Sequence, residues 1–356
     1  MNLYECSHSQ AKLSIDLDAL VANWQFFSKL GGAEAAAVLK ANAYGLGIEK
    51  CAKALSDAGC NSFFVAHLSE GLELRKYLPK PSRIFVLNGF IGCEASILFD
   101  NGLTPVINNL DQVRAWQAYK RSCVVHFDTG MNRLGIGFDV VEQAAKELRG
   151  QEIEFVMSHL ACASDIEHPL NKIQLSRFHD ICEWFPNIDK SLSASAGALL
   201  GQEYHFDLLR PGIGLYGSNP VDNRENPMRP VLTLSAPIIQ VVEVGAGQSI
   251  GYGATYTAKK AARIAIVALG YADGFLRSAS NCGFGVLEGA NCPIVGRVSM
   301  DLIAIDISAA SRTIRCGDRV EFLGPNADID EQAALMGTIA YEILTGLGNR
   351  FLREYQ

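Results

Sequence analysis

The run AAAVLKANAYGLG, residues 35–47, places a single lysine, Lys40, between an apolar segment and a turn. Val38 and Leu39 favour burial in a strand, and the glycines that follow favour a loop, so Lys40 lies where the chain leaves the core. Poor solvation disfavours the ammonium form of a lysine and makes its free amine available as a nucleophile. Taken alone, such a pattern more often marks a lysine whose stem covers apolar surface at a strand end, so the rest of the chain must decide.

Seven further short apolar segments follow this one, separated by longer stretches. Most of these stretches have apolar residues three and four positions apart, as in IEKCAKALSDAG and NKIQLSRFHDICEWF, which predicts amphipathic helices. Eight alternating units predict a (β/α)8 barrel, with a doubly wound open sheet as the alternative. The predicted strands are residues 36–39, 62–66, 83–87, 104–107, 123–128, 153–158, 190–194 and 207–210.

The amino-acid composition changes at SNPVDNRENPMRP, residues 218–230, where three prolines and three asparagines predict a linker. Beyond it, ARIAIVAL, CPIVGRVSMDLIAIDI and RVEFLG are strand-like runs, and EQAALMGTIAYEILTGLG predicts a helical end. We therefore expect an α/β barrel over residues 16–225 and a mostly β domain over residues 226–356. We expect the N-terminal segment 1–15 to join the β domain.

Composition limits the classes of function. The 356 residues suit two domains, and 49% hydrophobic with 19% charged residues is ordinary for a globular protein. A net charge of -7 without a basic cluster argues against nucleic acid or an anionic membrane as partner. No apolar run is long enough to span a bilayer, and the polar N-terminus does not resemble a signal peptide, so we expect a cytoplasmic protein.

The cysteines do not predict a metal site. They form no C-x-x-C pair and no paired spacing with histidine, so we expect no zinc. In a reducing cytosol they act as small apolar residues, although Cys162 lies close to candidate site residues. The ten are Cys6, Cys51, Cys60, Cys93, Cys123, Cys162, Cys182, Cys282, Cys292 and Cys316.

Polar residues follow the ends of the predicted barrel strands, where such barrels carry their active sites. The loops after strands seven and eight commonly bind phosphate through backbone N–H groups. A lysine, a phosphate site and an arginine together fit pyridoxal 5'-phosphate, PLP. The residues at these ends are Lys40, the run Asp128 to Arg133, His159, Ser195, Arg210 and the run Gly212 to Gly214.

Six motifs in order along the chain resemble those of one family, the alanine racemases. They are AVLKANAYGLG, DTGMNRLG, RPGIGLYG, GYGATYTA, GYADG and VGRVSMD. The resemblance implies a PLP-dependent racemase of L- and D-alanine, with an eight-stranded barrel and a C-terminal β domain. It leaves open whether the enzyme serves D-alanine and peptidoglycan synthesis or alanine breakdown.

The resemblance also implies catalytic roles. Lys40 would hold PLP covalently and act as the base on one face of the substrate Cα, and Tyr252 would act on the opposite face. A phenol has an ordinary pKa of about 10, so ionising it at pH 7 costs about 4 kcal/mol without help. His159, relaying to Arg210, would supply that help as a cationic or hydrogen-bonding neighbour. Arg133 would hold the substrate carboxylate and interact with the phenolic oxygen of PLP.

Further residues are implied by the same resemblance. Arg210 would face the pyridine nitrogen, and because an arginine does not share its proton, the ring would stay unprotonated and side reactions such as transamination would be limited. Met300 would offer its backbone amide to the substrate carboxylate. The expected phosphate ligands are Tyr44, Ser195, Gly212, Ile213 and Tyr341. Tyr252, Tyr271, Met300 and Asp301 would reach the partner's lysine, so we expect a homodimer with a shared active site.

Two positions depart from the family pattern. Many members carry, seven residues before the site arginine, a carbamylated lysine that positions that arginine, and this chain has His126 there. Arg133 must then be oriented by something else, such as an anion, water or a carboxylate. Ala194 stands where an asparagine commonly precedes the phosphate-binding serine, which removes one polar contact worth about 1 kcal/mol.

Other functions fit parts of the pattern. A basic amino-acid decarboxylase on the same scaffold would not require Tyr252 opposite the lysine. A non-catalytic PLP-binding protein is usually a single barrel, without the β domain that carries GYGATYTA. Serine stays open as a substrate in place of alanine, and a purely structural role stays open for Tyr271 and Asp301.

Overall fold

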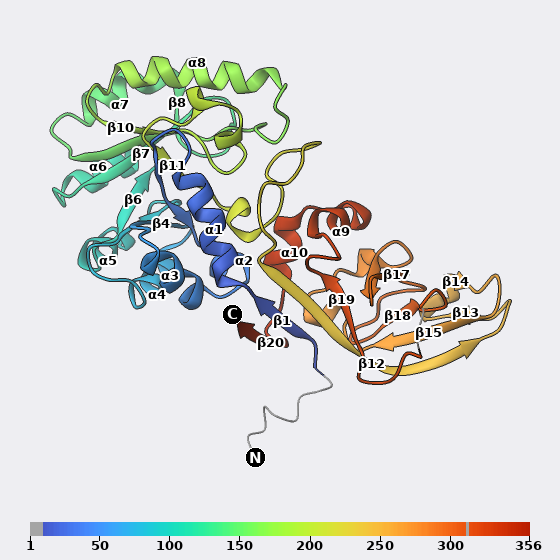
Figure 1. Cartoon of the computed structure of the whole chain (residues 1–356). Helices are drawn as coiled ribbons and strands as arrows, with labels where there is room; N and C mark the ends of the chain where they lie inside the picture. The colour runs from blue at the N-terminus through green and yellow to red at the C-terminus, as the bar shows by residue number, and fades with distance from the viewer. Residues whose placement is uncertain (1–9, 311–312) are drawn as a thin grey trace. The chain divides into compact units, whose positions relative to one another are not determined.

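In the computed structural model, which describes residues 10–310 and 313–356, the chain divides into two units (Figure 1). One unit is Asp18–Arg229, and the other combines the chain up to Leu17 with Pro230–Gln356. Each unit is described by itself below. Residues 1–9 of the predicted N-terminal segment, with Cys6, lie outside the described residues.

Parallel strands of the first unit pair in the order β10-β9-β7-β6-β5-β4-β3, and β8 pairs with β7 at one end. They are β3 (Ala37–Val38), β4 (Ser62–Val65), β5 (Arg83–Val86), β6 (Thr104–Ile107), β7 (Cys123–Asp128), β8 (Ile136–Gly137), β9 (Ile153–Met157) and β10 (Asp189–Ser191). The buried rings of Phe64, Phe85 and Phe155 pack together inside this sheet, with centroids 4.8 to 6.1 Å apart.

The last strand closes the sheet on the first. β11 (Leu208–Leu209) pairs in parallel with β2 (Glu34–Ala35). On the same side Val38 N donates to Pro211 O over 3.1 Å, and on the other side Arg210 N donates to Ser193 O over 2.9 Å. These bonds insert the eighth strand between the seventh and the first, so the predicted barrel is confirmed and the open-sheet alternative is wrong.

Helices surround the parallel strands of this unit (Figure 1). They are α1 (Leu17–Ser28), α3 (Ile48–Asp57), α4 (Leu68–Arg75), α5 (Glu94–Asp100), α6 (Leu110–Gln117), α7 (Val141–Glu147) and α8 (Pro169–Glu183). The predicted amphipathic segments correspond to five of them, α3, α4, α6, α7 and α8. Within the described ranges, every helix is too short or too polar to cross a bilayer.

The second unit is mostly β, as predicted. Its longest strand, β12 (Leu232–Val244), pairs with β1 (Lys12–Ile15), β15 and β19, and β1 pairs in parallel with β20 (Leu352–Tyr355). The remaining strands are β13 (Ser249–Ile250), β14 (Tyr256–Thr257), β15 (Ala262–Val267), β16 (Phe284–Leu287), β17 (Ala290–Pro293), β18 (Ile303–Asp306) and β19 (Arg319–Leu323).

Glycines break two runs that the sequence pattern predicts as continuous. The C-terminal helical run is two helices, α9 (Ile329–Met336) and α10 (Ala340–Gly346), because Gly337 adopts a φ of +71° and caps α9. The strand-like run at residues 292–307 is interrupted between β17 and β18, where Gly296 adopts a φ of +81°. The interrupting loop carries Met300 and Asp301.

Candidate active site

Lys40 begins a turn with left-handed backbone conformation just after β3. The short element α2 (Lys40–Tyr44) has φ values of 53°, 56° and 53° at Ala41, Asn42 and Ala43, which is left-handed backbone. Residues other than glycine pay about 1–2 kcal/mol each for this conformation. Such a turn persists only where its surroundings hold it in place.

Glu70 on α4 supplies part of that support. Its Oε1 accepts a hydrogen bond from Ala41 N over 2.7 Å, and its Oε2 accepts one from Ala66 N over 2.7 Å. The Asn42 side chain adds a bond by accepting from Ile48 N over 2.8 Å. Sequence reasoning missed Glu70, although its place three residues after His67, at the start of a predicted helix, was an available signal.

The surroundings of Lys40 lower its pKa below 10.5. Desolvation of the half-buried amine is the largest cause, the Arg133 guanidinium acts in the same direction, and Glu70 opposes both. A lower pKa increases the fraction of free amine near neutral pH, which is the form that bonds a carbonyl group. The environment of Lys40 is therefore suited to covalent attachment of an aldehyde.

Three predicted phosphate ligands meet beside this turn. Ser195 Oγ accepts hydrogen bonds from Gly212 N over 2.9 Å and from Gly214 N over 3.1 Å. A Cβ on Gly212 would lie only 2.5 Å from Tyr44 Oη, so the Tyr44 hydroxyl reaches the glycine backbone. The Tyr44 ring stacks on Tyr216 with centroids 4.6 Å apart. The Tyr44 and Ser195 hydroxyls beside this glycine backbone fit a phosphate group. Ile213 is buried at the start of η5 (Ile213–Tyr216).

Arg210 is buried inside the barrel without an ion-pair partner among the described carboxylates. Its Nη2 donates to Ser158 O over 2.6 Å and to Leu192 O over 3.1 Å, and its Nη1 donates to Ser191 Oγ. Burial lowers the pKa of Arg210 to about 9, so the group stays cationic at neutral pH. The Arg210 Nε makes no hydrogen bond with a described residue.

The loop after β7 presents Arg133. The Asp128 carboxylate holds this loop by accepting from Gly130 N over 2.7 Å, Met131 N over 2.9 Å and Arg133 N over 3.2 Å. The Arg133 side chain is exposed, and its guanidinium makes no hydrogen bond or ion pair with a described residue. It is therefore available to an anionic ligand.

His159 follows β9 and is half-buried. Desolvation lowers the pKa of His159 well below 6.5, and the cations Arg210 and Arg133 lower it further. The imidazole is therefore neutral near pH 7. A neutral imidazole can help Tyr252 only by hydrogen bonding, so of the two kinds of help considered this state favours hydrogen bonding.

Gln174 on α8 joins the loops after β7 and β9. Its Nε2 donates to His159 O over 2.9 Å and to Thr129 Oγ1 over 3.1 Å, and its Oε1 accepts from Ala161 N over 2.8 Å. Sequence reasoning missed this residue because it gave no signal beyond its place in a predicted helix.

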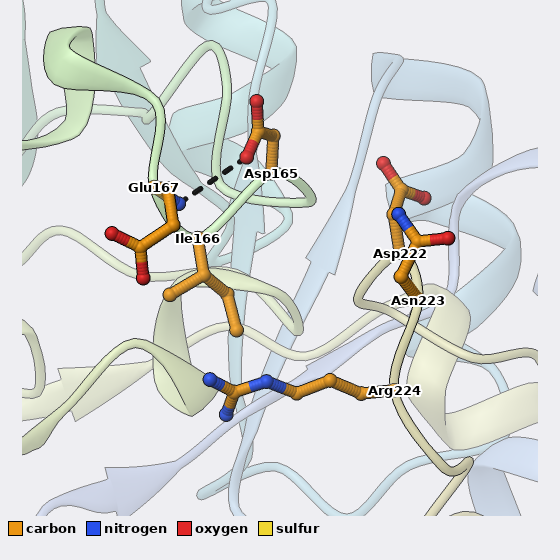
Figure 2. A pocket seen from close by; sticks show the side chains of 6 residues that line it. All are labelled: Asp165, Ile166, Glu167, Asp222, Asn223 and Arg224. Atoms are coloured by element: carbon orange, nitrogen blue, oxygen red, sulfur yellow. Dashed lines mark hydrogen bonds between the residues drawn. The ribbon is translucent and has the colours of Figure 1, made fainter.

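A hollow of about 380 Å³ in the same unit lies outside this group (Figure 2). Its lining combines one guanidinium with three carboxylates, which would repel a phosphate dianion. It is lined by Asp165, Ile166, Glu167, Asp222, Asn223 and Arg224, none of which is a predicted site residue.

In the second unit, three predicted residues expose large side chains on adjacent loops. Tyr252 in η6 (Tyr252–Ala254) is 73% exposed, Met300 is 54% and Tyr271 in η7 (Tyr271–Asp273) is 42%. Tyr271 N donates to Ser299 O and Ala272 N donates to Met300 O, both over 3.0 Å, so η7 and the Met300 loop lie together.

Asp301 is already paired within this unit. Its Oδ1 accepts from Arg350 Nη1 over 2.9 Å, and Arg350 Nε lies 3.2 Å from Asp273. This ion pair is compatible with the structural role left open for Asp301. Tyr341 lies on α10 in the same unit, whereas the other residues predicted to bind phosphate belong to the barrel unit.

Comparison with known proteins identifies the family. Residues 15–220 match the family described as alanine racemase, N-terminal domain, and residues 231–355 match alanine racemase, C-terminal domain. The chain belongs to the alanine racemase family. The predicted family and class of enzyme are thereby confirmed, and the decarboxylase and non-catalytic alternatives are wrong.

Individual alanine racemases agree over almost the whole chain. The biosynthetic and catabolic alanine racemases of Agrobacterium fabrum are each 45% identical to it, covering 97% and 96% of this chain and 93% and 91% of theirs. The crystal structure of alanine racemase from Bartonella henselae with covalently bound pyridoxal phosphate has a TM-score of 0.93 and 35% identity, covering 98% of this chain and 99% of that one. Equal identity to both Agrobacterium enzymes favours neither physiological role.

The charges around Lys40 predict how its titration responds to substitution. Arg133→Met removes a cation, so the pKa of Lys40 should rise toward 10.5, whereas Glu70→Gln should lower it further. The midpoint can be measured in cofactor-free protein from the pH dependence of Lys40 acetylation, followed by peptide mass spectrometry. Arg114→Met, which changes an exposed ion pair with Glu147, is the matched control and should leave the midpoint unchanged. A midpoint that falls in Arg133→Met would contradict the electrostatic assignment.

Proposed function

We propose that this chain interconverts L- and D-alanine with Lys40 and Tyr252 moving the Cα proton on opposite faces of the substrate. Its membership of the alanine racemase family makes it a PLP-dependent racemase. What we propose is which of its residues bind the cofactor and move the proton. The observation that carries the assignment is the half-buried Lys40 amine of lowered pKa, in the same turn as Tyr44, whose hydroxyl meets Gly212 and its partner Ser195.

The barrel residues would bind and orient the cofactor. Ser195, Gly212, Ile213 and Tyr44 would hold the phosphate, together with Tyr341. When bound, PLP withdraws electrons from the substrate Cα and acidifies its proton. Lys40 would then accept or return that proton with its neutral amine, and Arg133 would hold the substrate carboxylate by a charge-assisted hydrogen bond.

We assign Tyr252 to the opposite face, contributed by a second copy of the chain. Gly251 and Gly253 on either side of it have φ values of +75° and +70°, so the tyrosine projects from a tight turn. Because the Tyr252 side chain is 73% exposed, a role as a base needs a covering surface and a hydrogen-bond partner that stabilises the ionised phenol. A homodimer with a shared site would provide both, with neutral His159 as the partner.

Met300 would complete the carboxylate site from the same copy. No hydrogen bond of the described residues uses its N–H, which leaves that donor for the substrate. Tyr271 would lie beside it, and the Arg350 pair of Asp301 would hold the loop. The nine described cysteines are free, in keeping with the reducing cytoplasm that we propose as its location.

Exchange of the α-proton with solvent tests the two bases separately. Tyr252→Phe should lower exchange from L-alanine by about 10²- to 10⁴-fold, the contribution of a general base, and largely spare exchange from D-alanine. Lys40→Ala should abolish covalent cofactor binding, seen as loss of visible absorbance. NMR in D₂O follows each enantiomer, and L-serine is the comparison substrate. Equal loss from both enantiomers in Tyr252→Phe, with cofactor retained, would argue against the two-base assignment.

A complementation experiment tests the shared site. Lys40→Ala and Tyr252→Phe should each be inactive, but subunit exchange would create hybrids with one intact site and one doubly altered site. Random reassortment of a twofold dimer then restores about a quarter of wild-type activity. Native mass spectrometry counts the hybrids. Hybrids that form without regaining activity would place both bases in one chain.

Arg210 predicts a restriction on side reactions. We assign its unused Nε to the ring nitrogen, and a group that keeps its proton there would leave the ring unprotonated. Arg210→Glu should therefore slow racemisation by about tenfold or more and allow transamination, measured as pyruvate formed from alanine. Arg149→Glu, at an exposed position after α7, is a control for altered charge. If Arg210→Glu racemises alanine at the wild-type rate and forms no pyruvate, the assignment of Arg210 to the ring nitrogen is wrong.

A further inference from the structure

His126 is a buried polar residue that the proposed reaction does not use. It lies in β7, two residues before the aspartate that holds the Arg133 loop, and its side chain is 7% exposed. Its Nδ1 lies 2.8 Å from Asn108 Oδ1. A buried imidazole with one nitrogen engaged poses the question of what the other nitrogen does.

The contacts of Asn108 determine which nitrogen of His126 carries hydrogen. Asn108 Nδ2 donates to Leu87 O over 2.9 Å and to Val106 O over 2.8 Å, so the amide nitrogen is committed to backbone carbonyls. Asn108 Oδ1 is then the atom facing His126, and it can only accept. His126 Nδ1 must therefore donate.

The second nitrogen is left as an acceptor. Burial lowers the pKa of His126 to about 3, with Arg210 and Arg133 acting in the same direction and Asp128 opposing them. The ring is therefore neutral at working pH, and with hydrogen on Nδ1 its Nε2 carries a lone pair. None of the described hydrogen bonds uses this lone pair.

The same edge of the ring faces the end of the arginine loop. A Cβ on Gly135 would lie 3.3 Å from His126 Cδ2, the atom bonded to Nε2. Gly135 has a φ of +115° and returns the loop to β8 two residues after Arg133. Nδ1 thus faces the preceding strand, and the Nε2 edge faces the loop that bears the unpartnered guanidinium.

We propose that His126 is a positioning residue whose Nε2 accepts a hydrogen bond from Arg133 and orients that guanidinium toward the substrate carboxylate. This inference rests on the proposed role of Arg133. A neutral acceptor suits the task, because it directs the guanidinium without cancelling its charge.

Binding of propionate, which is alanine without its amino group, tests the inference in the holoenzyme. His126→Leu removes the acceptor and should weaken propionate binding by about tenfold, the effect of one hydrogen bond to a charged group. It should raise KM for alanine more than it lowers kcat. His126→Gln keeps an acceptor at a similar reach and should recover affinity to within about threefold of wild type. His179→Leu, on the exposed face of α8, is the control.

A spectroscopic readout does not depend on any variant retaining full stability. In wild-type protein labelled with 15N-histidine, the His126 signals should show protonated Nδ1 and unprotonated Nε2 from pH 5 to 9. The His126→Gln spectrum assigns them among the seven histidines. Protonated Nε2, or equal propionate affinity in His126→Leu and wild type, would overturn the inference. If either result is found while the wild-type protein still racemises alanine, only the role of His126 is wrong and the proposed function stands. If the wild-type protein does not racemise alanine, the proposed function itself is wrong.

Discussion

The hydrogen bonds that close the barrel decide where every barrel residue of the site lies. Val38 N donates to Pro211 O, and Val38 O accepts from the Tyr216 hydroxyl over 2.9 Å. Both bonds join the strand before Lys40 to the segment after Arg210. Without this closure the lysine and the phosphate donors would lie at opposite edges of an open sheet. With it, residues about 170 positions apart become neighbours.

Charge within the barrel is distributed to receive anions. Arg210 is buried without a carboxylate partner among the described residues, Arg133 is exposed without one, and Lys40 is half-buried. The two histidines nearby stay neutral because burial and these same cations disfavour a further positive charge. Neutral imidazoles can direct hydrogen bonds without repelling the cations or competing for the anions. This division fits a phosphate-bearing cofactor and a carboxylate substrate.

Local pattern was sufficient for the strands and for most of the helices, because short apolar segments mark buried strands and apolar residues three and four positions apart mark the buried face of a helix. It failed where one glycine changed the hand of the backbone, as at Gly337, since the apolar spacing continues on both sides. It also missed Glu70, Asn108 and Gln174. Each of them makes at least one bond to a residue between 18 and 45 positions away, and such a bond leaves no periodic signal.

The sequence by itself determined the eight barrel units, the mostly β second domain and the residue types that a PLP racemase needs at its strand ends. These follow from short-range spacing and from motifs of contiguous residues. Only the tertiary structure decided the left-handed turn at Lys40, the neutral state of His159, and the tautomer of His126. Desolvation and the orientation of a buried amide depend on what surrounds a group in space, and the chain order does not contain that information.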